Sequence, residues 1–482
     1  MIDLSKIEQY RENNRIEAKK ALGGLPKSIW ETYSAFANTL GGIILLGVEE
    51  DREHVLHTIN LPDPERLVRE FWEIVRNPKK ASVNILAGRH VQVETIGGNR
   101  IIVITVPRAQ RYDKPVYVEG NPFSGSYRRS GEGDYRCTRE EVQSMFRDAA
   151  VQTQDMKVLE FLGTDALDWE SVRRYRARTR QYRPGHAWED LADPEFLRKL
   201  GAIGRGADGA LHPTGAGLLM FGFAREIVRE FPNYSLDYRE YLGSDDAQVT
   251  DRIFSSSGGW SGNLYDFYFH VSERIARDIP LALRRRANGA EDATAVCRAL
   301  GEALANCLVN ADYYGQQGIS AVKCRGMAVF SNPGAFRIEV EAAKSGGVSD
   351  PRNGALIRMF HLAGIGERMG GGIPNIYSVW KKLGWAPPVI EELFNPDRIK
   401  VSLPTQRSGG RTPGRGGAGK TAVHKAAMIV YLTDNVSGRT SDFAQLLGLK
   451  DARVRALLGE LIAEGIVVQE GGRRYRVYKL KA

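Results

Sequence analysis

Several carboxylates and a lysine lie close together near the start of this 482-residue chain. The segment RIEAKK reads as a strand, and the alternation of its side chains places Glu17 and Lys19 on one face. A helix-like stretch follows, and the apolar run IILLGV then ends beside Glu49 and Asp51, while Glu12 lies just upstream. Acids that hold a divalent cation, with an ammonium to meet developing phosphate charge, are what phosphodiester cleavage requires. The same residues also suit an ordinary charged surface, and the sequence leaves both interpretations open.

This segment resembles the Schlafen-type AlbA-like domain. The resemblance rests on the E-x-K strand, the AFANT-L-GG helix end and the GIILLGVEED strand. In animal Schlafen proteins the domain is an endoribonuclease, and in many bacterial relatives it is described as a DNA-binding domain. The resemblance implies a nuclease centre whose carboxylates are Glu12, Glu17 and one acid among Glu49 to Asp51, with Glu49 as the expected ligand of Mg²⁺ or Mn²⁺ and Lys19 and Asp51 beside it. The family more often has aspartate at the position of Glu49, and the longer glutamate changes the geometry expected there.

A basic turn near residue 130 extends the resemblance. Tyr127, Arg129 and Gly131 match a Y-x-R-x-G stretch that closes the sheet of the Schlafen-type domain. Arginines interleaved with tyrosines would suit a groove that follows a phosphate backbone, so Arg128 and Arg129 are candidate nucleic-acid contacts. The alternative is a solvated basic turn without a ligand.

Composition favours an intracellular protein with a polyanionic partner. The net charge is +9 and the isoelectric point is near 9.2, which favours nucleic acid. The four cysteines are scattered without a CxxC pair, as in the reduced thiols of a cytosol-like compartment. The start of the chain lacks the pattern of a signal peptide, and the longest apolar runs are too short to span a membrane. We therefore expect a cytoplasmic protein with no membrane partner.

The chain is long for one core, and its segments predict an α+β multidomain protein. The predicted divisions are 1–145 (Schlafen/AlbA-like α+β domain), 146–215 (helical connecting region), 216–404 (GHKL-like α/β sandwich), 405–421 (flexible basic linker) and 422–482 (winged helix-turn-helix). The helical region contains five arginines between Arg173 and Arg180, which we interpret as an exposed helix face.

A second group of chemical residues lies on the predicted helix DATAVCRALGEALANCLVNADYY. Glu302, Asn306 and Asn310 recur every four residues, so all three lie on one face. A glutamate and an asparagine among apolar neighbours are unusual for a plain core helix. The pair resembles the first box of the GHKL, or Bergerat-type, ATPases. There the asparagine amide oxygen holds the Mg²⁺ that bridges the phosphates, and the glutamate orients or deprotonates water.

Two further segments occur in the order that this family requires. GMAVFSNPG reads as a strand that ends at Asn332 and Gly334, where the second box of the fold reads the adenine. A glycine-rich segment with Gly366 and Gly370, Gly371 and Gly372 then leads into a helix, and its backbone N–H groups could bind phosphates. The resemblance is to a divergent GHKL-like domain of bacterial proteins that also carry the Schlafen-type domain, and it implies ATP with Mg²⁺ as the ligand. A purely structural copy of the fold is the alternative.

The chain departs from the family pattern at two places. Asn310 and Ala311 stand where the family usually has a His-Arg pair, and Asn332 stands where standard GHKL proteins have an adenine-reading aspartate. A different nucleotide motif, GRGGAGKT at 414–421, satisfies the Walker A pattern. We reject it because no buried strand leads directly into it and no strand of Walker B type follows.

Residues 422–482 resemble a winged helix-turn-helix. The predicted elements are a helix in AVHKAAMIVYLTDN, a short helix in TSDFAQLLG, a recognition helix in LKDARVRALLGELIAEG and a hairpin that turns at Gly471 and Gly472. Ala452, Val454, Leu457, Leu458 and Leu461 are expected to form the core face of the recognition helix. The outward cations on this helix and on the wing, expected to contact nucleic acid, are Lys450, Arg453, Arg455, Arg473, Arg474 and Arg476. Many winged helices bind proteins instead, and that alternative stays open.

Three functions fit these patterns. The favoured one is a nucleic-acid-binding, ATP-binding regulator of the transcriptional type, acting as a homo-oligomer on DNA or RNA. The second is a metal-dependent endonuclease, for example one that cuts tRNA or DNA in anti-phage defence. The third is a scaffold whose nucleotide site controls oligomer assembly. Enzymatic activity, as a nuclease or a weak ATPase, is left open by the sequence.

Overall fold

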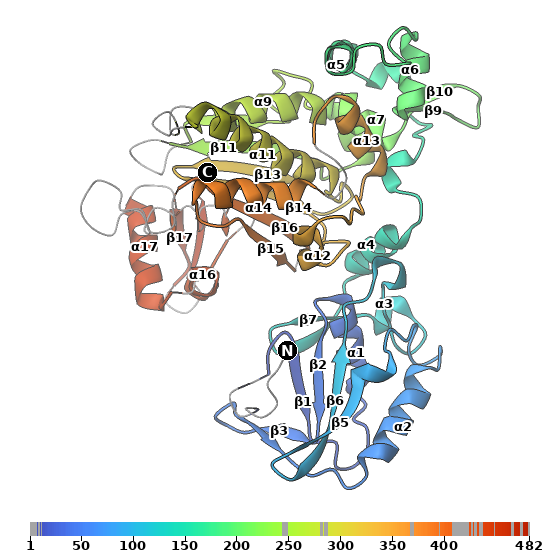
Figure 1. The fold of residues 1–482 in the computed structure, drawn as a ribbon, viewed down its shortest axis with the longest axis vertical. Helices are drawn as coiled ribbons and strands as arrows, with labels where there is room; N and C mark the ends of the chain where they lie inside the picture. Colours follow the sequence, from blue (N-terminus) through green and yellow to red (C-terminus); the bar gives the residue numbers. More distant parts are fainter. Residues whose placement is uncertain are drawn as a thin grey trace. The chain divides into compact units, whose positions relative to one another are not determined.

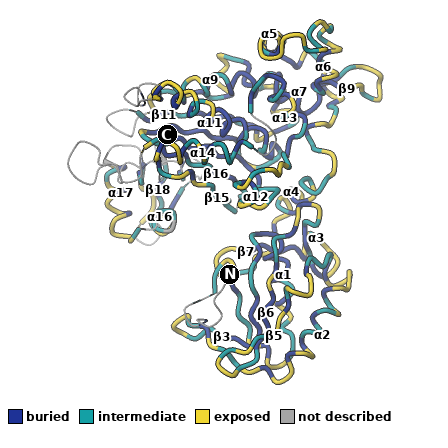
Figure 2. The backbone as a smooth tube through the Cα atoms, viewed as in Figure 1, coloured by how far each residue is buried: buried dark blue, intermediate teal, exposed yellow. Residues whose placement is uncertain are grey.

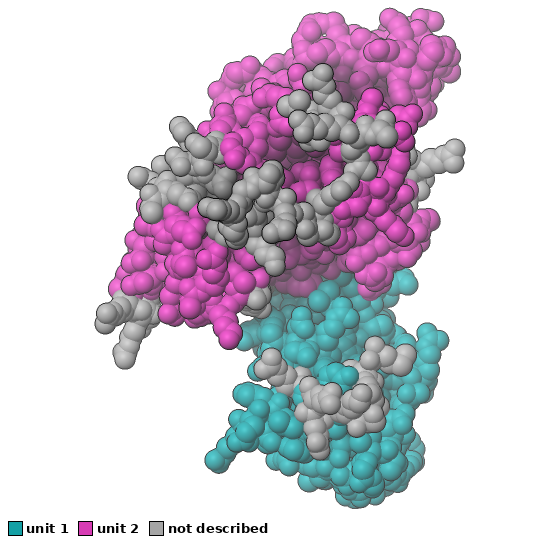
Figure 3. All heavy atoms as spheres, turned by 60° about the vertical axis from the view of Figure 1, so that its left-hand side comes forward, with its two compact units in different colours: residues 1–151 teal, residues 152–482 magenta. Residues whose placement is uncertain are grey.

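The structure is a computed structural model, and it divides into two compact units, residues 1–151 and 152–482 (Figure 3). The residues that it describes are 7, 10, 12–242, 249–279, 283, 288–366, 371–394, 396–406, 424–425, 428, 431–432, 437–447, 449–463, 467–472 and 476–480. The rejected Walker A pattern at 414–421 and all but the first two residues of the predicted linker at 405–421 lie outside these ranges. The architecture is mixed α+β, as predicted, and the sheets are open (Figure 1).

The first unit is built on a four-stranded sheet in the order β1-β2-β6-β5. Its strands are β1 (Ile16–Lys19), β2 (Gly42–Leu46), β6 (Asn99–Val106) and β5 (Val91–Ile96). β1 runs parallel to β2, and the other pairs are antiparallel. The apolar side chains of β2 and β6 pack with α1 (Ile29–Asn38) and α2 (Pro64–Val75) into one core, because alternate residues of the strands face the helices.

Short elements complete this unit. They are the hairpin of β3 (Val48–Glu50) and β4 (Leu56–Thr58), the hairpin of β7 (Tyr127–Ser130) and β8 (Gly133–Arg136), and the helices α3 (Pro122–Gly125) and α4 (Arg139–Ala149). α4 begins with a capping box in which Thr138 and Glu141 satisfy each other's backbone N–H groups. Because α4 continues to Ala149, the first unit extends a few residues beyond the predicted boundary at 145.

The second unit begins with the predicted helical region. Its elements are η4 (Gln154–Met156), η5 (Thr164–Ala166), α5 (Trp169–Tyr182), α6 (Asp193–Leu200), β9 (Ile203–Arg205), β10 (Leu211–Pro213), α7 (Gly215–Phe221) and α8 (Ala224–Glu230). They share one large hydrophobic core with the elements that follow, so the boundary predicted at 215 does not separate two cores.

A six-stranded sheet dominates this unit, in the order β12-β11-β13-β14-β16-β15. Its strands are β11 (Leu236–Tyr241), β12 (Asp251–Phe254), β13 (Ile319–Cys324), β14 (Met327–Pro333), β15 (Val389–Leu393) and β16 (Arg398–Pro404). The helices are α9 (Leu264–Ala276), α11 (Gly289–Val309), α12 (Val340–Ser345), α13 (Gly354–Leu362) and α14 (Gly372–Leu383), and α9, α11 and α14 form a layer over the sheet (Figure 1). α11 is buried along most of its length (Figure 2).

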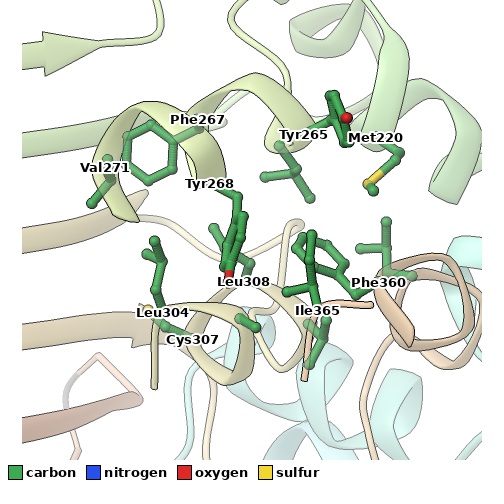
Figure 4. Close-up of a cluster of buried hydrophobic side chains, with 14 of the residues drawn as sticks. Met220, Tyr265, Phe267, Tyr268, Val271, Leu304, Cys307, Leu308, Phe360 and Ile365 are labelled. Carbon is green, nitrogen blue, oxygen red and sulfur yellow. The ribbon is translucent and has the colours of Figure 1, made fainter. Parts of the chain in front are cut away.

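The core between α9, α11 and α13 fixes the helix that carries the candidate residues. Tyr268 points from α9 toward α11, beside Leu304 and Leu308, and its ring packs edge-on against Phe360 of α13 with centroids 5.6 Å apart (Figure 4). Such contacts hold the rotation of α11 about its axis, because its apolar side chains fit only one set of neighbours. The face of α11 that carries Glu302, Asn306 and Asn310, which we call the polar stripe, therefore points in one defined direction.

The C-terminal elements follow the predicted order. They are α16 (Thr440–Leu447), α17 (Asp451–Ala463), β17 (Val467–Glu470) and β18 (Val477–Leu480), and the described residues of the predicted first helix are also helical. Their buried side chains form one cluster with Tyr241, Val322 and Val329 from alternate positions of the six-stranded sheet. Among the helices that the structure describes, none has the length and apolar character needed to cross a membrane.

Candidate functional site

The polar stripe predicted on α11 is present. The Asn306 amide donates to Glu302 Oε1 at 3.3 Å, and the Asn310 amide donates to the Asn306 carbonyl at 2.9 Å. α11 ends at Val309, so Asn310 is the residue that caps its C-terminus. Glu302 is 8% exposed although its side chain is polar. A buried carboxylate beside an amide, at the surface of a helix layer, is a polar site and not ordinary core packing.

The second predicted box lies opposite this stripe. β14 pairs with β16 so that Asn332 faces Ile399, and both side chains line the same cavity as Glu302. Asn332 is 3% exposed, and its amide lies 3.2 Å from the Pro333 carbonyl. Gly334 follows with φ of +101°, and a Cβ there would collide with the Arg352 guanidinium. Glycine is therefore required by both the backbone and the neighbour.

The start of α14 lies directly against the stripe. A Cβ on Gly372 would collide with Glu302 Oε1 and would lie 3.0 Å from the Asn306 amide nitrogen. A Cβ on Gly366 would lie 3.5 Å from Glu302 Oε2. Gly371 precedes α14 as its N-cap residue, and Gly370 lies outside the described residues. The absence of side chains at these glycines is what brings main-chain atoms beside the polar stripe.

These segments enclose a cavity of about 140 Å³, which we call the α11 cavity. Its polar lining includes Glu302, Asn306, Asn310, Asn332 and Arg352, and Gly366 and Gly372 also reach it. Its apolar lining includes Ile373, Ile376, Ile390, Ile399 and Val401. Gly334 and Gly371 adjoin lining residues and do not line the cavity themselves. One cavity thus has an apolar part and a polar end, as small-molecule sites do.

Two residues that brace this cavity were missed by the sequence reasoning. Asn353 donates to the carbonyls of Val309 and Ala311 at 3.0 and 2.8 Å, and Arg352 donates to the carbonyl of Asn310 at 2.6 Å. These bonds satisfy backbone carbonyls at the C-terminal end of α11, which the helix itself leaves unpaired. The only signal in the sequence was an asparagine placed before an apolar helix, which suggests a helix start and not a brace.

α13 connects Arg352 and Asn353 to the glycine segment. Its first turn is bound by Asp155, a residue near the beginning of the second unit. The Asp155 carboxylate accepts from the backbone N–H groups of Ala355 and Leu356, at 2.8 and 2.9 Å, in the first turn of α13. Asp155 is 2% exposed, and burial raises the pKa of its carboxyl group above the ordinary value. The residue acts as a helix cap supplied from far away in the sequence.

The N-terminal acids form an ion-pair network. Glu17 accepts from the Lys19 ammonium at 2.7 Å and pairs with the Arg129 guanidinium at 2.8 Å. Glu12 accepts from the backbone N–H of Ala18 at 2.8 Å. Glu50 accepts from the backbone N–H of Glu12 at 3.2 Å, so Glu50 is the third acid beside Glu12 and Glu17.

The two other predicted acids are engaged elsewhere. Glu49 pairs with Lys20, and Asp51 pairs with His57 at 2.6 Å. Hydrogen bonds from the Val55 backbone and from His57 lower the pKa of Asp51. Within the described part of the chain, no group of three or more His, Cys, Asp or Glu side chains is arranged to hold a metal ion. The residues present therefore do not fit the predicted Mg²⁺ or Mn²⁺ site of Glu12, Glu17 and Glu49.

Arg128 and Arg129, the predicted nucleic-acid contacts, lie in the interior of the first unit. Their side chains are 7% and 1% exposed. Arg128 pairs with Glu141 at 3.4 Å, and Arg129 binds Asp134 at 3.0 Å as well as Glu17. Both are internal cations, because they neutralise acids that lie at distant points of the sequence.

The burial of Glu12 predicts a specific pH dependence of stability. Burial raises the pKa of Glu12, and the nearby Glu17 and Glu50 add to the rise. A carboxyl whose pKa is raised by folding stabilises the fold below its unfolded pKa and loses that contribution as pH rises through the folded pKa. We expect the Glu12→Gln variant to gain stability over the wild type between about pH 4 and pH 7, by less than about 1 kcal/mol because Glu12 is only partly buried.

Urea unfolding at several pH values would measure this gain. Glu53→Gln is the matched control, since Glu53 is exposed. Parallel stability curves for the Glu12→Gln variant and the wild type would contradict the expectation.

The C-terminal module presents its predicted cations on α17. Val454, Leu457, Leu458 and Leu461 are buried, while Lys450, Arg453 and Arg455 are exposed. Ala452, expected in the core face, is exposed because the helix turns its first residues toward solvent. β17 and β18 form the predicted hairpin around Gly471, Arg476 is exposed, and Arg473 and Arg474 lie outside the described residues.

Comparisons with known proteins match three segments of the chain. Family models match the chain at residues 12–138 ("Schlafen, AlbA_2"), 143–237 (a domain of unknown function) and 327–403 ("Putative ATP-dependent DNA helicase recG C-terminal"). The last match begins at β14, so it includes Asn332 and the glycine segment, while α11 precedes it. A search among curated proteins gave no significant match.

Solved structures give two further likenesses. The crystal structure of the DIP2311 protein from Corynebacterium diphtheriae is 17% identical, with 97% of this chain and 95% of that chain covered and a TM-score of 0.38. The solution structure of the N-terminal domain of "Putative ATP-dependent DNA Helicase RecG-related Protein" from Nitrosomonas europaea is 35% identical, with 28% and 90% covered and a TM-score of 0.22. The family matches alone show that residues 12–138 resemble the Schlafen AlbA_2 domain and that residues 327–403 resemble the ATPase-like recG C-terminal domain.

Proposed function

We propose that this protein is a nucleic-acid-binding regulator that binds ATP with Mg²⁺ in the α11 cavity. The observation that carries the proposal is that one cavity gathers Glu302 and Asn306 of α11, Asn332 of β14, and glycines before and at the start of α14. These segments lie far apart in the chain, and each supplies the residue type that its part of a nucleotide needs. Two of the three matched families also point to a function related to nucleic acid and ATP binding.

The residues present fit a magnesium-bound nucleotide. The Asn306 amide oxygen would hold the cation, whose charge would neutralise the phosphates to which it is bound. The hydrogen bond from the Asn306 amide holds the Glu302 carboxylate at the polar end of the cavity, where it can orient a water molecule. Isoleucine side chains from α14, β15 and β16 provide the apolar faces for an adenine ring, and Asn332 lies at that side as a polar partner.

The C-terminal module is the proposed contact with duplex DNA. Lys450, Arg453 and Arg455 are exposed near the N-terminal end of α17, which is the end that a recognition helix directs toward base edges. The exposed Arg476 lies beside the hairpin. We further propose that the protein acts as a homo-oligomer in the cytoplasm, because regulators that read duplex DNA commonly bind two half-sites.

The nuclease and scaffold alternatives have less support. A nuclease centre needs carboxylates that are free to bind a cation, whereas Glu17 is bound by Lys19 and Arg129 and Glu49 is bound by Lys20. A scaffold without nucleic-acid contact gives no reason for the exposed cations of α17. Incubating the full chain with tRNA and short DNA duplexes, with Mn²⁺ or with EDTA, separates these functions: intact nucleic acid supports the regulator, and metal-dependent cleavage contradicts it.

Calorimetric titration tests the proposed ligands directly. We expect the full chain to bind a non-hydrolysable ATP analogue with Mg²⁺ and to bind it weakly in EDTA. We also expect it to bind duplex DNA with an affinity that falls steeply as salt rises, since phosphate contacts release counterions. Absence of nucleotide binding would remove the α11 cavity from the proposal, and absence of salt-dependent DNA binding would remove the C-terminal module.

A further inference from the structure

A second cavity lies beside the α11 cavity in the same unit. It has a volume of about 610 Å³ and is formed by α5, α9, α11 and the segment 364–366, and we call it the α5–α9 cavity. The two cavities share Glu302, Ile365 and Gly366 as lining residues. A volume of this size is within the range of small-molecule sites. The proposed binding of ATP does not use this space.

Two arginines from different helices line the α5–α9 cavity. Arg178 comes from α5, where its Nε donates to the Ala363 carbonyl at 2.8 Å and its guanidinium lies over the Phe269 ring at 4.7 Å. Arg298 comes from α11, one helical turn before Glu302, and it is exposed. One guanidinium group can bind two phosphate oxygens at the same time, so Arg178 and Arg298 can hold a phosphate group.

Aromatic side chains lie beside these cations. Tyr182 follows Arg178 by one turn of α5, lines the cavity and is 56% exposed. Its ring is packed closely against the backbone of Gly364, where a Cβ would collide with it. An exposed tyrosine whose position is fixed in this way is a surface on which a nucleobase can stack. Phe269 and Tyr268 of α9 continue the aromatic lining.

Carboxylates complete the lining. Glu273 of α9 and Glu302 of α11 both reach the cavity, so two acids accompany the two arginines. Acids at such sites accept hydrogen bonds from ribose hydroxyl groups, as in dinucleotide-binding folds. Burial raises the pKa of Tyr268 to about 12, and Glu302 adds to the rise, while Arg178 opposes it. The Tyr268 hydroxyl is therefore neutral at physiological pH and remains a hydrogen-bond donor.

We propose that the α5–α9 cavity binds a mononucleotide as a second ligand, separate from the nucleotide of the α11 cavity. Arg178 and Arg298 bind its phosphate, Tyr182 stacks on its base, and Glu273 accepts from its ribose. The site involves α5, which also binds the C-terminal end of α13. The side chains of Tyr175, Arg178 and Arg183 donate hydrogen bonds to the carbonyls of Met359, Ala363 and His361, respectively. A ligand here contacts the same helix that positions the end of α13 before Gly366.

Titration of the full-length Asn306→Ala variant with AMP tests the site, because that background removes the proposed cation ligand of the α11 cavity. We expect AMP to bind this variant. Adding Arg298→Gln should lower the AMP affinity about tenfold, as expected for the loss of charge-assisted hydrogen bonds. Adding Tyr182→Ala should lower the affinity for AMP and leave that for orthophosphate unchanged, since only the base contact is lost.

Arg173→Gln is the matched control, because Arg173 is an exposed arginine of α5 that pairs with Glu170 and does not line the cavity. AMP affinity that is equal in the Arg298→Gln, Tyr182→Ala and control variants would overturn the proposal. Loss of AMP binding in Asn306→Ala, together with unchanged AMP affinity when Arg298→Gln and Tyr182→Ala are made in the wild-type background, would also overturn it, because AMP would then occupy the α11 cavity. Failure of ATP binding with retained AMP binding would contradict the proposed function and leave this second site supported.

Discussion

Replacement of Asn306 by alanine is expected to lower the affinity for magnesium-ATP at least about 100-fold. Loss of a residue that only orients a metal ligand already costs 10- to 100-fold, and Asn306 would be a ligand itself. The Asn306 side chain also holds Glu302 through a hydrogen bond of 3.3 Å, so its loss releases the carboxylate as well. The helix should persist, because alanine favours helix more than asparagine and the lost hydrogen bond is long.

Calorimetry with a non-hydrolysable ATP analogue measures this effect, and circular dichroism confirms that the fold is kept. Glu291→Ala is the matched control, because Glu291 is an exposed residue near the beginning of the same helix and does not line the α11 cavity. Unchanged affinity in Asn306→Ala, with the control also unchanged, would show that the nucleotide does not use the polar stripe of α11. An affinity lost equally in both variants would indicate damage to the helix.

The polar stripe could be predicted from the sequence because helix periodicity is local. Residues four apart lie on one face of any α-helix, so Glu302, Asn306 and Asn310 needed no knowledge of the fold. That these residues lie near β14 and the glycine segment could also be expected, because the three family boxes occur along this chain in the same order as in the family. Asn353 and Arg352 could not be found in this way, because their partners are carbonyl groups more than forty residues away.

The acidic cluster shows a second limit, which comes from the backbone. GIILLGVEED reads as one strand in the sequence, but Gly47 adopts φ of +84° and separates β2 from β3. β3 then pairs with β4 instead of continuing the four-stranded sheet. Glu50, and not Glu49, therefore lies beside Glu12. A single glycine in the left-handed region changes which side chains share a face, and the sequence does not show when it does so.

The five arginines of α5 illustrate the difference between an exposed cation and an available one. Arg173, Arg174 and Arg180 are exposed as predicted, yet each pairs with an acid of the same unit. Arg176 and Arg178 are half-buried and donate to backbone carbonyls. Charge count alone predicted a solvated helix face, because most of the acids and carbonyls that bind these arginines come from other elements, and only Glu170 belongs to α5 itself.

Replacement of Arg129 by alanine is expected to destabilise the first unit by about 3–5 kcal/mol, the cost of removing one partner of a buried charge network. The Arg129 side chain binds Glu17 at 2.8 Å and Asp134 at 3.0 Å, and it also donates to the carbonyls of Asn13 and Ile16. Without it, two acids that are 12% exposed lose the cation between them. Hydrogen exchange of β1 and β7 measures the effect within this unit, and Arg52→Ala, at an exposed arginine, is the control.

This variant also decides how nucleic-acid binding by the first unit should be interpreted. If Arg129→Ala loses both DNA or RNA affinity and exchange protection, the loss of affinity follows from unfolding of the sheet. Arg129→Lys should then restore only part of the affinity and part of the protection, since one ammonium cannot replace a guanidinium that binds two acids and two carbonyls. A loss of affinity with β1 and β7 still fully protected would contradict our assignment of Arg129 as an internal cation. It would mean that this side chain leaves its acids to reach phosphate, and the original interpretation of the Y-x-R-x-G turn as a nucleic-acid contact would then be correct.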